Sequence, residues 1–385
     1  MVVPKLRFKA DDGSDFPELE AKSLFDICEY KNKQSVGKNY VGTENMKQNF
    51  SGLESLDEET EMKGVCYCEG DTLMSNIRPY LRKTWKADRE GVCSTDVLVF
   101  HPIDVVSEYL HYLIASDKFI SYVMTGAKGV KMPRGDKEHM MKFSIMVPSL
   151  PEQQKIADFL STIDTIIEKQ RATVLAWEER KKGVMQKLFS QEVRFKADDG
   201  SDFPDWEEKK LGDIGTVKMC KRVLKEQTSE SGDVPFYKIG TFGGIPDAFI
   251  SRELYEELKT KYSFPRKGNI LLSAAGTIGR TVIYDGEDAF FQDSNIVWLD
   301  NDSSVLDKFL LQFYNQTSWD NIEGGTIKRL YNGLFLSKII PLPSLPEQQK
   351  IADCLSALDA VIEKQKETLE KWQELKKGLL QQMFV

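Results

Sequence analysis

The sequence predicts an α+β fold built as a pseudo-twofold tandem duplication, in which two strand-rich mixed α/β domains are each followed by a long helix. Two pairs of identical strings predict the duplication. SLPEQQKIAD occurs at residues 149–158 and again at 344–353, and RFKADDGSDFP occurs at 7–17 and again at 194–204. At 385 residues the chain is long enough for two or three domains, each with its own core.

A long helix follows each copy of SLPEQQKIAD. Pro151 in the first turn is a favourable helix start, and Ser149 is the expected cap. Apolar residues then recur at the alternating spacing of four and three that is typical of a coiled-coil seam. The predicted seam residues are Ile156, Leu160, Ile163, Ile167 and Trp177 in the first helix and Ile351, Leu355, Leu358, Ile362 and Trp372 in the second.

Polar residues interrupt both seams at equivalent places, Gln170 and Lys181 in the first helix and Gln365 and Lys376 in the second. Polar seam residues lower stability and fix the alignment of the two helices. Two matched seams in one chain most simply pack on each other. The alternative is that each is an ordinary core helix of its own domain, but a helix of about 39 residues would span roughly 58 Å, which is too long for one small core.

The block before each helix reads as strands and turns. GDTLMS at 70–75 corresponds to GNILLS at 268–273, and STDVLVF at 94–100 corresponds to DSNIVWL at 293–299. Short β-branched and aromatic runs cut by Gly, Asp and Asn are typical of strands. We therefore expect four parts, namely a first domain over 1–147, a first helix region over 148–191, a second domain over 192–342 and a second helix region over 343–385.

Composition narrows the class of protein. No stretch approaches the roughly 18 uninterrupted apolar residues of a membrane span. The first residues lack the apolar segment and cleavage site of a signal peptide, so a cytoplasmic protein is expected. Six scattered cysteines are typical of a reduced cytosol, and the spacing of Cys66 and Cys68 is too short for a zinc knuckle, so no metal site is expected.

The sequence holds no recognisable catalytic constellation. Phosphate-binding and dinucleotide-binding glycine motifs, the G-x-S-x-G elbow and H-E-x-x-H are all missing from it. The three histidines, His101, His111 and His139, all lie in the first unit. Because a duplicated enzyme would be expected to repeat its base, we interpret them as structural and expect no catalytic residues.

Basic clusters recur at equivalent places in both blocks, although the net charge of −8 disfavours a general nucleic-acid binder. Lys and Arg on Gly-rich loops suit phosphate contact, and Asn and Gln can pair with an adenine edge. Each cluster alone could equally be a solvated surface; their recurrence favours nucleic acid. The candidate DNA-binding residues are Asn45, Asn76, Arg78, Arg82, Lys83, Lys128, Lys131 and Arg134 in the first block and Lys221, Arg222, Lys267, Ser273, Thr277, Arg280, Gln292, Asn295, Lys328 and Arg329 in the second.

Taken together, these segments resemble a known family. The matching pieces are YVGTENM at 40–46, GDTLMSNIRPYLRK at 70–83, KMPRGDK at 131–137, KGNILLSAAGTIGR at 267–280, GGTIKRLYNGLFLSKIIPLP at 324–343 and both LPEQQKIA helix starts. Over essentially its whole length the chain resembles the specificity subunit of type I restriction–modification enzymes.

The resemblance implies a function without catalysis in this chain. Two target-recognition domains would each read one half of an interrupted double-stranded DNA sequence. The two helices would pair as an intramolecular antiparallel coiled coil that spaces the domains and carries two methyltransferase subunits. S-adenosylmethionine, ATP and Mg would then be bound by the methyltransferase and restriction subunits, and no cofactor by this chain. The alternatives are a stand-alone duplicated DNA-binding regulator and a coiled-coil adaptor without a DNA role.

Overall fold

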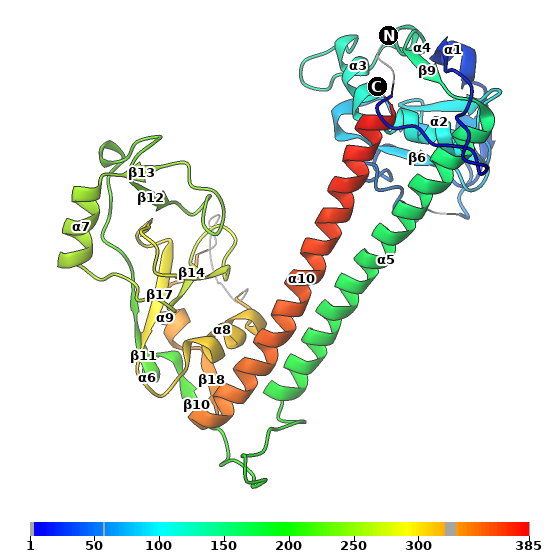
Figure 1. Ribbon diagram of the computed structural model, residues 1–385. Helices are drawn as coiled ribbons and strands as arrows, with labels where there is room; N and C mark the ends of the chain where they lie inside the picture. Colours follow the sequence, from blue (N-terminus) through cyan, green and yellow to red (C-terminus); the bar gives the residue numbers. More distant parts are fainter. Residues whose placement is uncertain (1–3, 57, 320–328, 385) are drawn as a thin grey trace. The chain divides into compact units, whose positions relative to one another are not determined.

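The structure is a computed structural model that describes residues 4–56, 58–319 and 329–384 (Figure 1). It divides into two compact units. The first unit comprises Met1–Thr173 and Gln365–Val385, and the second comprises Val174–Lys364. Each unit therefore holds one strand-rich block and a stretch of each long helix. The predicted division into four parts stays a prediction, and each unit is described by itself.

A four-stranded antiparallel sheet lies at the centre of the first unit, in the order β2-β8-β5-β6. Its strands are β2 (Cys28–Lys31), β8 (Val97–Pro102), β5 (Thr72–Ser75) and β6 (Thr84–Lys86). The two inner strands are buried on both faces, because Met74 and Leu98 belong to one core and Leu73 and Val99 to another. Burial on both faces explains why TLMS and VLVF lack the polar–apolar alternation of a half-exposed strand.

Shorter elements surround this sheet. A second sheet has the order β3-β4-β7, and β1 pairs with β9. These strands are β3 (Gln34–Gly37), β4 (Met62–Tyr67), β7 (Gly91–Cys93), β1 (Glu20–Ser23) and β9 (Ser144–Val147). The short helices are α1 (Leu24–Ile27), α2 (Ser107–Ile114), α3 (Asp117–Thr125), α4 (Lys137–Met141) and the 3-10 turn η1 (Pro79–Leu81).

The second unit repeats this plan. Its central sheet has the order β11-β17-β14-β15, which is the order of the first unit in equivalent strands. These strands are β11 (Gly215–Lys218), β17 (Ile296–Asn301), β14 (Ile270–Ser273) and β15 (Thr281–Ile283). Leu272 and Val297 face one core, whereas Leu271 and Trp298 face another. The strands predicted from GNILLS and NIVWL are therefore confirmed as inner strands buried on both faces.

The remaining elements of the second unit differ more. A three-stranded sheet has the order β13-β12-β16, and β10 pairs with β18. These strands are β13 (Phe249–Ile250), β12 (Val234–Tyr237), β16 (Phe290–Phe291), β10 (Glu207–Lys210) and β18 (Ile339–Leu342). The helices are α6 (Leu211–Ile214), α7 (Arg252–Lys261), α8 (Asp307–Gln316), α9 (Asn332–Leu336) and the 3-10 turn η2 (Lys225–Gln227). Helix α7 accounts for part of the extra length of this block, because the first block has no helix between β4 and β5 in the part that is described.

Two long helices, α5 (Leu150–Phe189) and α10 (Leu345–Met383), supply an antiparallel helix pair to each unit (Figure 1). In the first unit Gln170 of α5 donates to Gln365 of α10, and Asp164 pairs with Lys376. In the second unit Lys181 pairs with Asp359. Residue numbers therefore rise along α10 as they fall along the facing α5, so the helices are antiparallel. The polar seam residues make the contacts that fix this alignment.

The predicted seam residues are buried to different extents. Ile156, Leu160, Ile163, Ile167, Ile351, Leu355 and Ile362 are buried, whereas Trp177, Leu358 and Trp372 are half-buried. Ile156 and Leu160 share the first unit's core with strands and with the end of α10, and Ile351 and Leu355 share the second unit's core with strands and with the end of α5. The start of each helix is thus held by its domain as well as by the other helix.

The two repeated strings contact each other in both units. Arg7 makes two hydrogen bonds to Glu152, with distances of 3.1 Å from Nε to Oε1 and 2.6 Å from Nη2 to Oε2. Arg194 makes the same pair of bonds to Glu347, at 3.1 and 2.8 Å. Both carboxylates are almost completely buried, at 1% and 0% exposed. The identity of the strings therefore reflects one docking module built twice.

The glutamine that follows each buried glutamate ties the helix start to its domain. Gln153 accepts from the backbone N–H of Val106 at 2.9 Å, and Gln348 accepts from that of Leu306 at 2.9 Å. Ser149 occupies the predicted N-cap position, because α5 begins at Leu150 and the carbonyl of Ser149 accepts from the N–H of Gln153 at 2.9 Å. Its hydroxyl, however, is buried without a hydrogen-bond partner among the described residues and makes no cap. The side chains of the glutamate and the glutamine take over the positioning of the helix start.

Candidate nucleic-acid interface

Five of the predicted residues of the first unit lie on two segments that follow β5 and α3. The segments run antiparallel, with a bridge between Ile77 and Arg134 and a 2.8 Å bond from the N–H of Arg78 to the carbonyl of Pro133. Lys128 and Arg134 exchange two backbone hydrogen bonds of 2.9 Å and close a loop between them. The predicted residues brought together here are Asn76, Arg78, Lys128, Lys131 and Arg134.

The side chains of this group differ in how they are held. Arg134 binds both carboxylate oxygens of Asp96, at 3.1 and 3.2 Å. Lys128 donates to Asp136 at 2.7 Å, and this bond raises the pKa of the lysine. Lys131 is exposed, whereas Asn76 is buried with its Oδ1 atom lacking a partner. The group thus offers exposed cations beside a carboxylate that the sequence analysis did not select.

The loop next to this group contains residues with strained backbone conformations, which hydrogen bonds to a facing segment keep in place. Arg78 and Arg82 have left-handed φ values of 51° and 55°, and the facing residues Asn49 and Phe50 have 54° and 59°. Asn49 and Phe50 donate to the carbonyls of the η1 loop at 3.1 and 2.7 Å. Such residues cost roughly 1–3 kcal/mol each and concentrate at functional sites. The loop presents Tyr80, which is 46% exposed.

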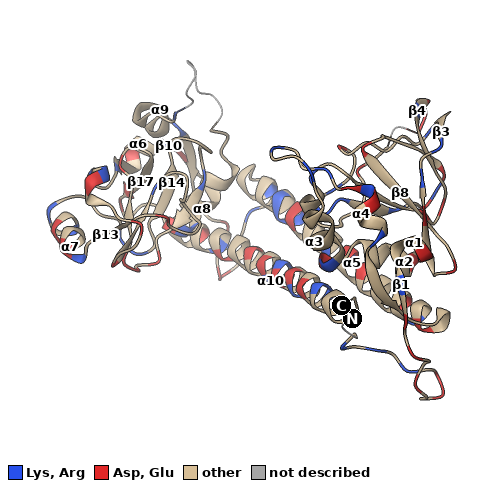
Figure 2. Ribbon diagram, turned by 90° about the horizontal axis from the view of Figure 1, so that it is seen from above, with Lys and Arg blue, Asp and Glu red and all other residues tan. Residues whose placement is uncertain are grey.

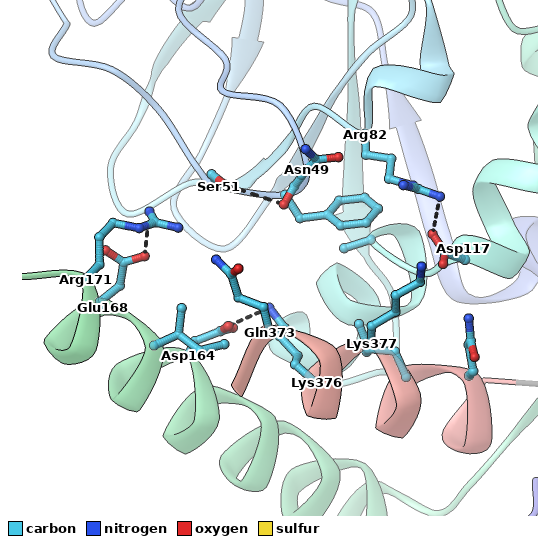
Figure 3. Close-up of a pocket in the computed structure, with 15 residues that line it drawn as sticks. Asn49, Ser51, Arg82, Asp117, Asp164, Glu168, Arg171, Gln373, Lys376 and Lys377 are labelled. Atoms are coloured by element: carbon cyan, nitrogen blue, oxygen red, sulfur yellow. Dashed lines mark hydrogen bonds and ion pairs between the residues drawn. The ribbon is translucent and has the colours of Figure 1, made fainter. Parts of the chain in front are cut away.

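Arg82, Lys83 and Asn45 serve local contacts near this loop. Lys83 donates to the carbonyl of Thr43 at 2.7 Å, and the side chain of Asn45 accepts from the N–H of Gly42 at 2.8 Å. Arg82 pairs with Asp117 at 2.9 Å inside a cavity of about 380 Å³ that is also lined by α5 and α10 (Figure 3). Arg82 therefore lies beside the helix pair of its own unit.

In the second unit, four predicted residues line one cavity of about 530 Å³, and Lys225 and Lys238 line it too. Those four are Arg222, Gln292, Asn295 and Arg329. The amide oxygen of Gln292 accepts from the N–H of Ile239 at 2.9 Å, which leaves its amino group for another partner. The cavity therefore combines cations with amide groups, as the recognition of a base edge beside phosphates requires.

The other predicted residues of the second unit lie around this cavity or away from it. Arg222 pairs with Asp293 at 2.9 Å, and the ammonium group of Lys221 lies 4.7 Å from the ring centre of Tyr262. Arg280 donates to the carbonyl of Phe242 at 2.9 Å. Ser273 is buried and donates to the carbonyl of Thr277 at 2.5 Å, so it orders the turn. Lys267 and Thr277 are exposed, and Lys328 lies outside the described residues.

The described part of the chain also bears on catalysis and metal binding. No group of three or more His, Cys, Asp or Glu residues suited to a metal ion occurs there. None of its helices is long and apolar enough to cross a membrane. Burial lowers the pKa of His111 to about 4. His101 bonds to Asp71 at 2.6 Å, and His139 stacks on Tyr122.

Comparison with known proteins gives matches over most of the chain. A family model for the type I restriction modification DNA specificity domain matches twice, over residues 17–176 and 204–371. The chain belongs to this family. A type I restriction enzyme specificity subunit of Haemophilus influenzae is 41% identical over 258 residues, which are 66% of this chain and 65% of that protein. The chain thus spans a little under two thirds of that relative.

Two further members of the specificity family extend the comparison. A type I restriction enzyme specificity subunit of Methanocaldococcus jannaschii is 26% identical over 311 residues, which are 74% of this chain and 72% of that protein. The crystal structure of the S subunit of a type I restriction–modification system from M. genitalium has a TM-score of 0.57 at 14% identity, and the match covers 100% of this chain and 99% of that one. At this low sequence identity, the match shows that the two chains share a fold.

The two specificity domains place their candidate residues on the same backbone frame. Arg134 and Arg329 occupy equivalent positions, because each forms a bridge to the segment that follows an inner strand, at Ile77 and at Ala275. Both arginines were predicted from the sequence, whereas Asp96 and the left-handed residues Asn49 and Phe50 were not. Aligning STDVLVF with DSNIVWL could have identified Asp96 as the counterpart of Asn295, whereas no local pattern in the sequence predicts the left-handed pair.

Proposed function

We propose that this chain is the DNA-recognition subunit of a type I restriction–modification complex and that each unit reads one half of an interrupted duplex target. One observation carries the proposal. Both units build an edge with Arg, Lys and amide side chains on the same frame of strands, and the edges differ from each other in their side chains. Two unlike edges on one frame are what two unlike half-sites require.

The net negative charge of the chain does not oppose DNA binding. Acidic and basic residues alternate along α10 (Figure 2). Acidic runs away from the candidate residues in the sequence account for part of the negative charge, namely DDGSD at 11–15 and 198–202 and DEETE at 57–61. Lys131 and Lys128 stand on a closed loop where the backbone can approach a phosphate. Contacts to phosphate supply affinity without sequence information, and contacts to base edges supply the specificity.

The long helices would carry the methyltransferase subunits, one for each unit. Supporting this, both helices expose leucines that a monomer leaves in water, Leu375 at 47% and Leu175 at 57%. S-adenosylmethionine would be bound by those subunits, and ATP and Mg by restriction subunits that join the complex. The assembled complex would work in the cytoplasm, where the chromosomal DNA lies. No catalytic step is assigned to this chain.

The affinity for DNA tests the role of the loop. Lys131→Ala should weaken binding to all duplexes alike and should reduce the slope of log K against log salt by about 0.9 for each phosphate that the lysine neutralises. Lys63→Ala is the matched control, because Lys63 is an exposed lysine on β4 of the same unit, outside the edge. If both variants have the same slope of log K against log salt, the loop that carries Lys131 does not contact DNA phosphates.

The assembly tests the rest of the proposal. The tagged full chain should co-purify with a methyltransferase subunit, and cells that lose the gene should lose N6-methyladenine at one interrupted motif. A chain that binds DNA alone, with no change in methylation on deletion, would instead be a stand-alone regulator. A chain that shows no salt-dependent binding to duplex DNA would be an adaptor without a DNA role.

A further inference from the structure

In the first unit, one side chain pair stands where two backbone segments meet. Asp96 immediately precedes β8, and its carbonyl accepts from the N–H of Asn76 at 2.8 Å. Arg134 lies on the returning segment, bridged to Ile77. The guanidinium binds the carboxylate through Nε and Nη2, so the Nη1 atom has no hydrogen-bond partner among the residues that the structure describes. The arginine side chain is 52% exposed and the aspartate 35%.

The second unit has the same backbone with another pair of side chains. Asn295 immediately precedes β17, and its carbonyl accepts from the N–H of Ala274 at 2.7 Å. Arg329 is bridged to Ala275. Its guanidinium donates to the carbonyl of Ser294 at 2.7 Å, so the amide of Asn295 keeps both its donor and its acceptor available in the described structure.

The two pairs differ in their side chains and not in their backbone, because their backbone hydrogen bonds correspond. An exposed ion pair adds little to stability, so folding does not explain Asp96 beside Arg134. The backbone under each pair is nevertheless held by corresponding hydrogen bonds and bridges, and each pair borders the other candidate residues of its unit. A position whose backbone is kept while its side chain changes is where two half-sites of different sequence would be distinguished.

We propose that Asp96 with Arg134, and Asn295 beside Arg329, are the base-reading positions of the two half-sites, an inference that rests on the proposed DNA-recognition function. The carboxylate and guanidinium together match a C·G pair. Aspartate accepts from the cytosine N4 amino group, and arginine donates to guanine O6 and N7. The amide of Asn295 matches adenine, through N6 and N7. The lysines around them contact phosphates.

The test selects random-sequence duplexes with the full chain in its co-purified complex. The wild type should enrich an interrupted motif with a C·G pair in one half and an A·T pair in the other. Asp96→Asn should reduce the preference for its base pair about 5- to 150-fold in the first half only. Asn295→Asp should do the same in the second half only, with the new preference shifted toward C·G.

Two further variants keep the outcome unambiguous. Asp88→Asn is the matched control, because Asp88 is an exposed carboxylate paired with Arg89 at 2.7 Å in the same unit. It should change neither half. Arg134→Lys retains the charge but loses the two-pronged geometry, so it should relax the first half while its affinity for random duplex stays near that of the wild type.

The inference and the proposed function fail in different ways. If the wild type enriches no interrupted motif, the proposed function fails. If the wild type enriches one and the motif is unchanged in Asp96→Asn, Arg134→Lys and Asn295→Asp with unchanged thermal midpoints, the reading positions lie elsewhere and the inference is overturned. A uniform loss of affinity without a changed preference overturns the inference as well. So does a change in the same half of the motif by both Asp96→Asn and Asn295→Asp.

Discussion

The two helix starts and the two candidate DNA-binding edges of this chain have diverged to different extents. At the helix starts, Glu152 and Glu347 lie in identical sequence and make the same pair of bonds to an arginine. At the edges the backbone bonds correspond, but Asp96 in one unit is replaced by Asn295 in the other. The buried ion pair of each helix start is kept in its side chains, whereas the more exposed edge is kept only in its backbone.

Burial explains the difference. A buried carboxylate that loses its partner is left as an uncompensated charge, so the helix starts tolerate little change. An exposed side chain on a fixed backbone can be exchanged at almost no cost in stability. The difference in divergence is therefore expected from the energetics, and substitutions at each place should show it.

The largest expected effect is at the helix start of the second unit. Glu347→Ala removes the carboxylate that binds Arg194 and that accepts from Trp206 Nε1 at 2.9 Å. We expect a loss of roughly 3 kcal/mol in the free energy of unfolding, measured in urea. Glu152→Ala should lose about 1 kcal/mol less, because among the described residues the Glu152 carboxylate accepts from Arg7 alone.

Glu370→Ala is the matched control, since Glu370 is an exposed glutamate in the middle of the same helix. Its effect should lie within about 0.5 kcal/mol of zero. An equal effect of the two alanine variants of α10 would show that the docking module contributes nothing to stability.

An intermediate effect is expected where the helices meet their domain. Asp164 of α5 pairs with Lys376 of α10 and accepts from the Tyr112 hydroxyl of α2 at 2.7 Å. Lys376→Ala should cost about 2 kcal/mol, because it leaves a partly buried carboxylate without its cation. The double variant Asp164→Leu/Lys376→Met should recover stability to within about 1 kcal/mol of the wild type.

The control for this pair is Arg171→Ala on the same helix. Arg171 pairs with Glu168 one turn away, at 3.1 Å on the surface, so its loss should cost less than about 0.5 kcal/mol. A double variant that is no more stable than Lys376→Ala would contradict the view that the pair aligns the helices without stabilising them.

The sequence predicted the architecture because its signals are long or repeated. The strands of TLMS and VLVF, the two helices and their polar seam positions are all confirmed, since burial on both faces and heptad spacing leave patterns that are read locally. The pairing of Arg7 with Glu152 was not predicted, because two identical strings say nothing about which parts of them touch.

The candidate site was predicted less completely, for a physical reason. Arg134, Arg329, Gln292 and Asn295 were selected by residue type and recurrence, and the structure places each beside another candidate. Asp96 was passed over because an acidic residue does not suggest DNA contact until its arginine partner is seen. The left-handed φ of Phe50 has no signature in residue type, because tertiary hydrogen bonds impose it.

The smallest expected effect is a difference in acid sensitivity between the units. Burial lowers the pKa of His111 to about 4, with the ammonium of Lys376 adding to the effect, whereas the fifth residue of the equivalent helix α8 is Leu311. An unfolded histidine titrates near 6.5. Above that pH the ring is neutral in both states. As the pH falls toward 4, only the unfolded state takes up the proton, so the folded state loses stability.

The loss in the free energy of unfolding should reach about 1–2 kcal/mol between pH 7 and 5, with a slope of at most about 1.4 kcal/mol per pH unit. His111→Leu, which introduces the second unit's residue, should remove this part of the pH dependence. Urea unfolding of both proteins across that range measures it, and parallel losses would mean that the ring is already charged in the folded chain.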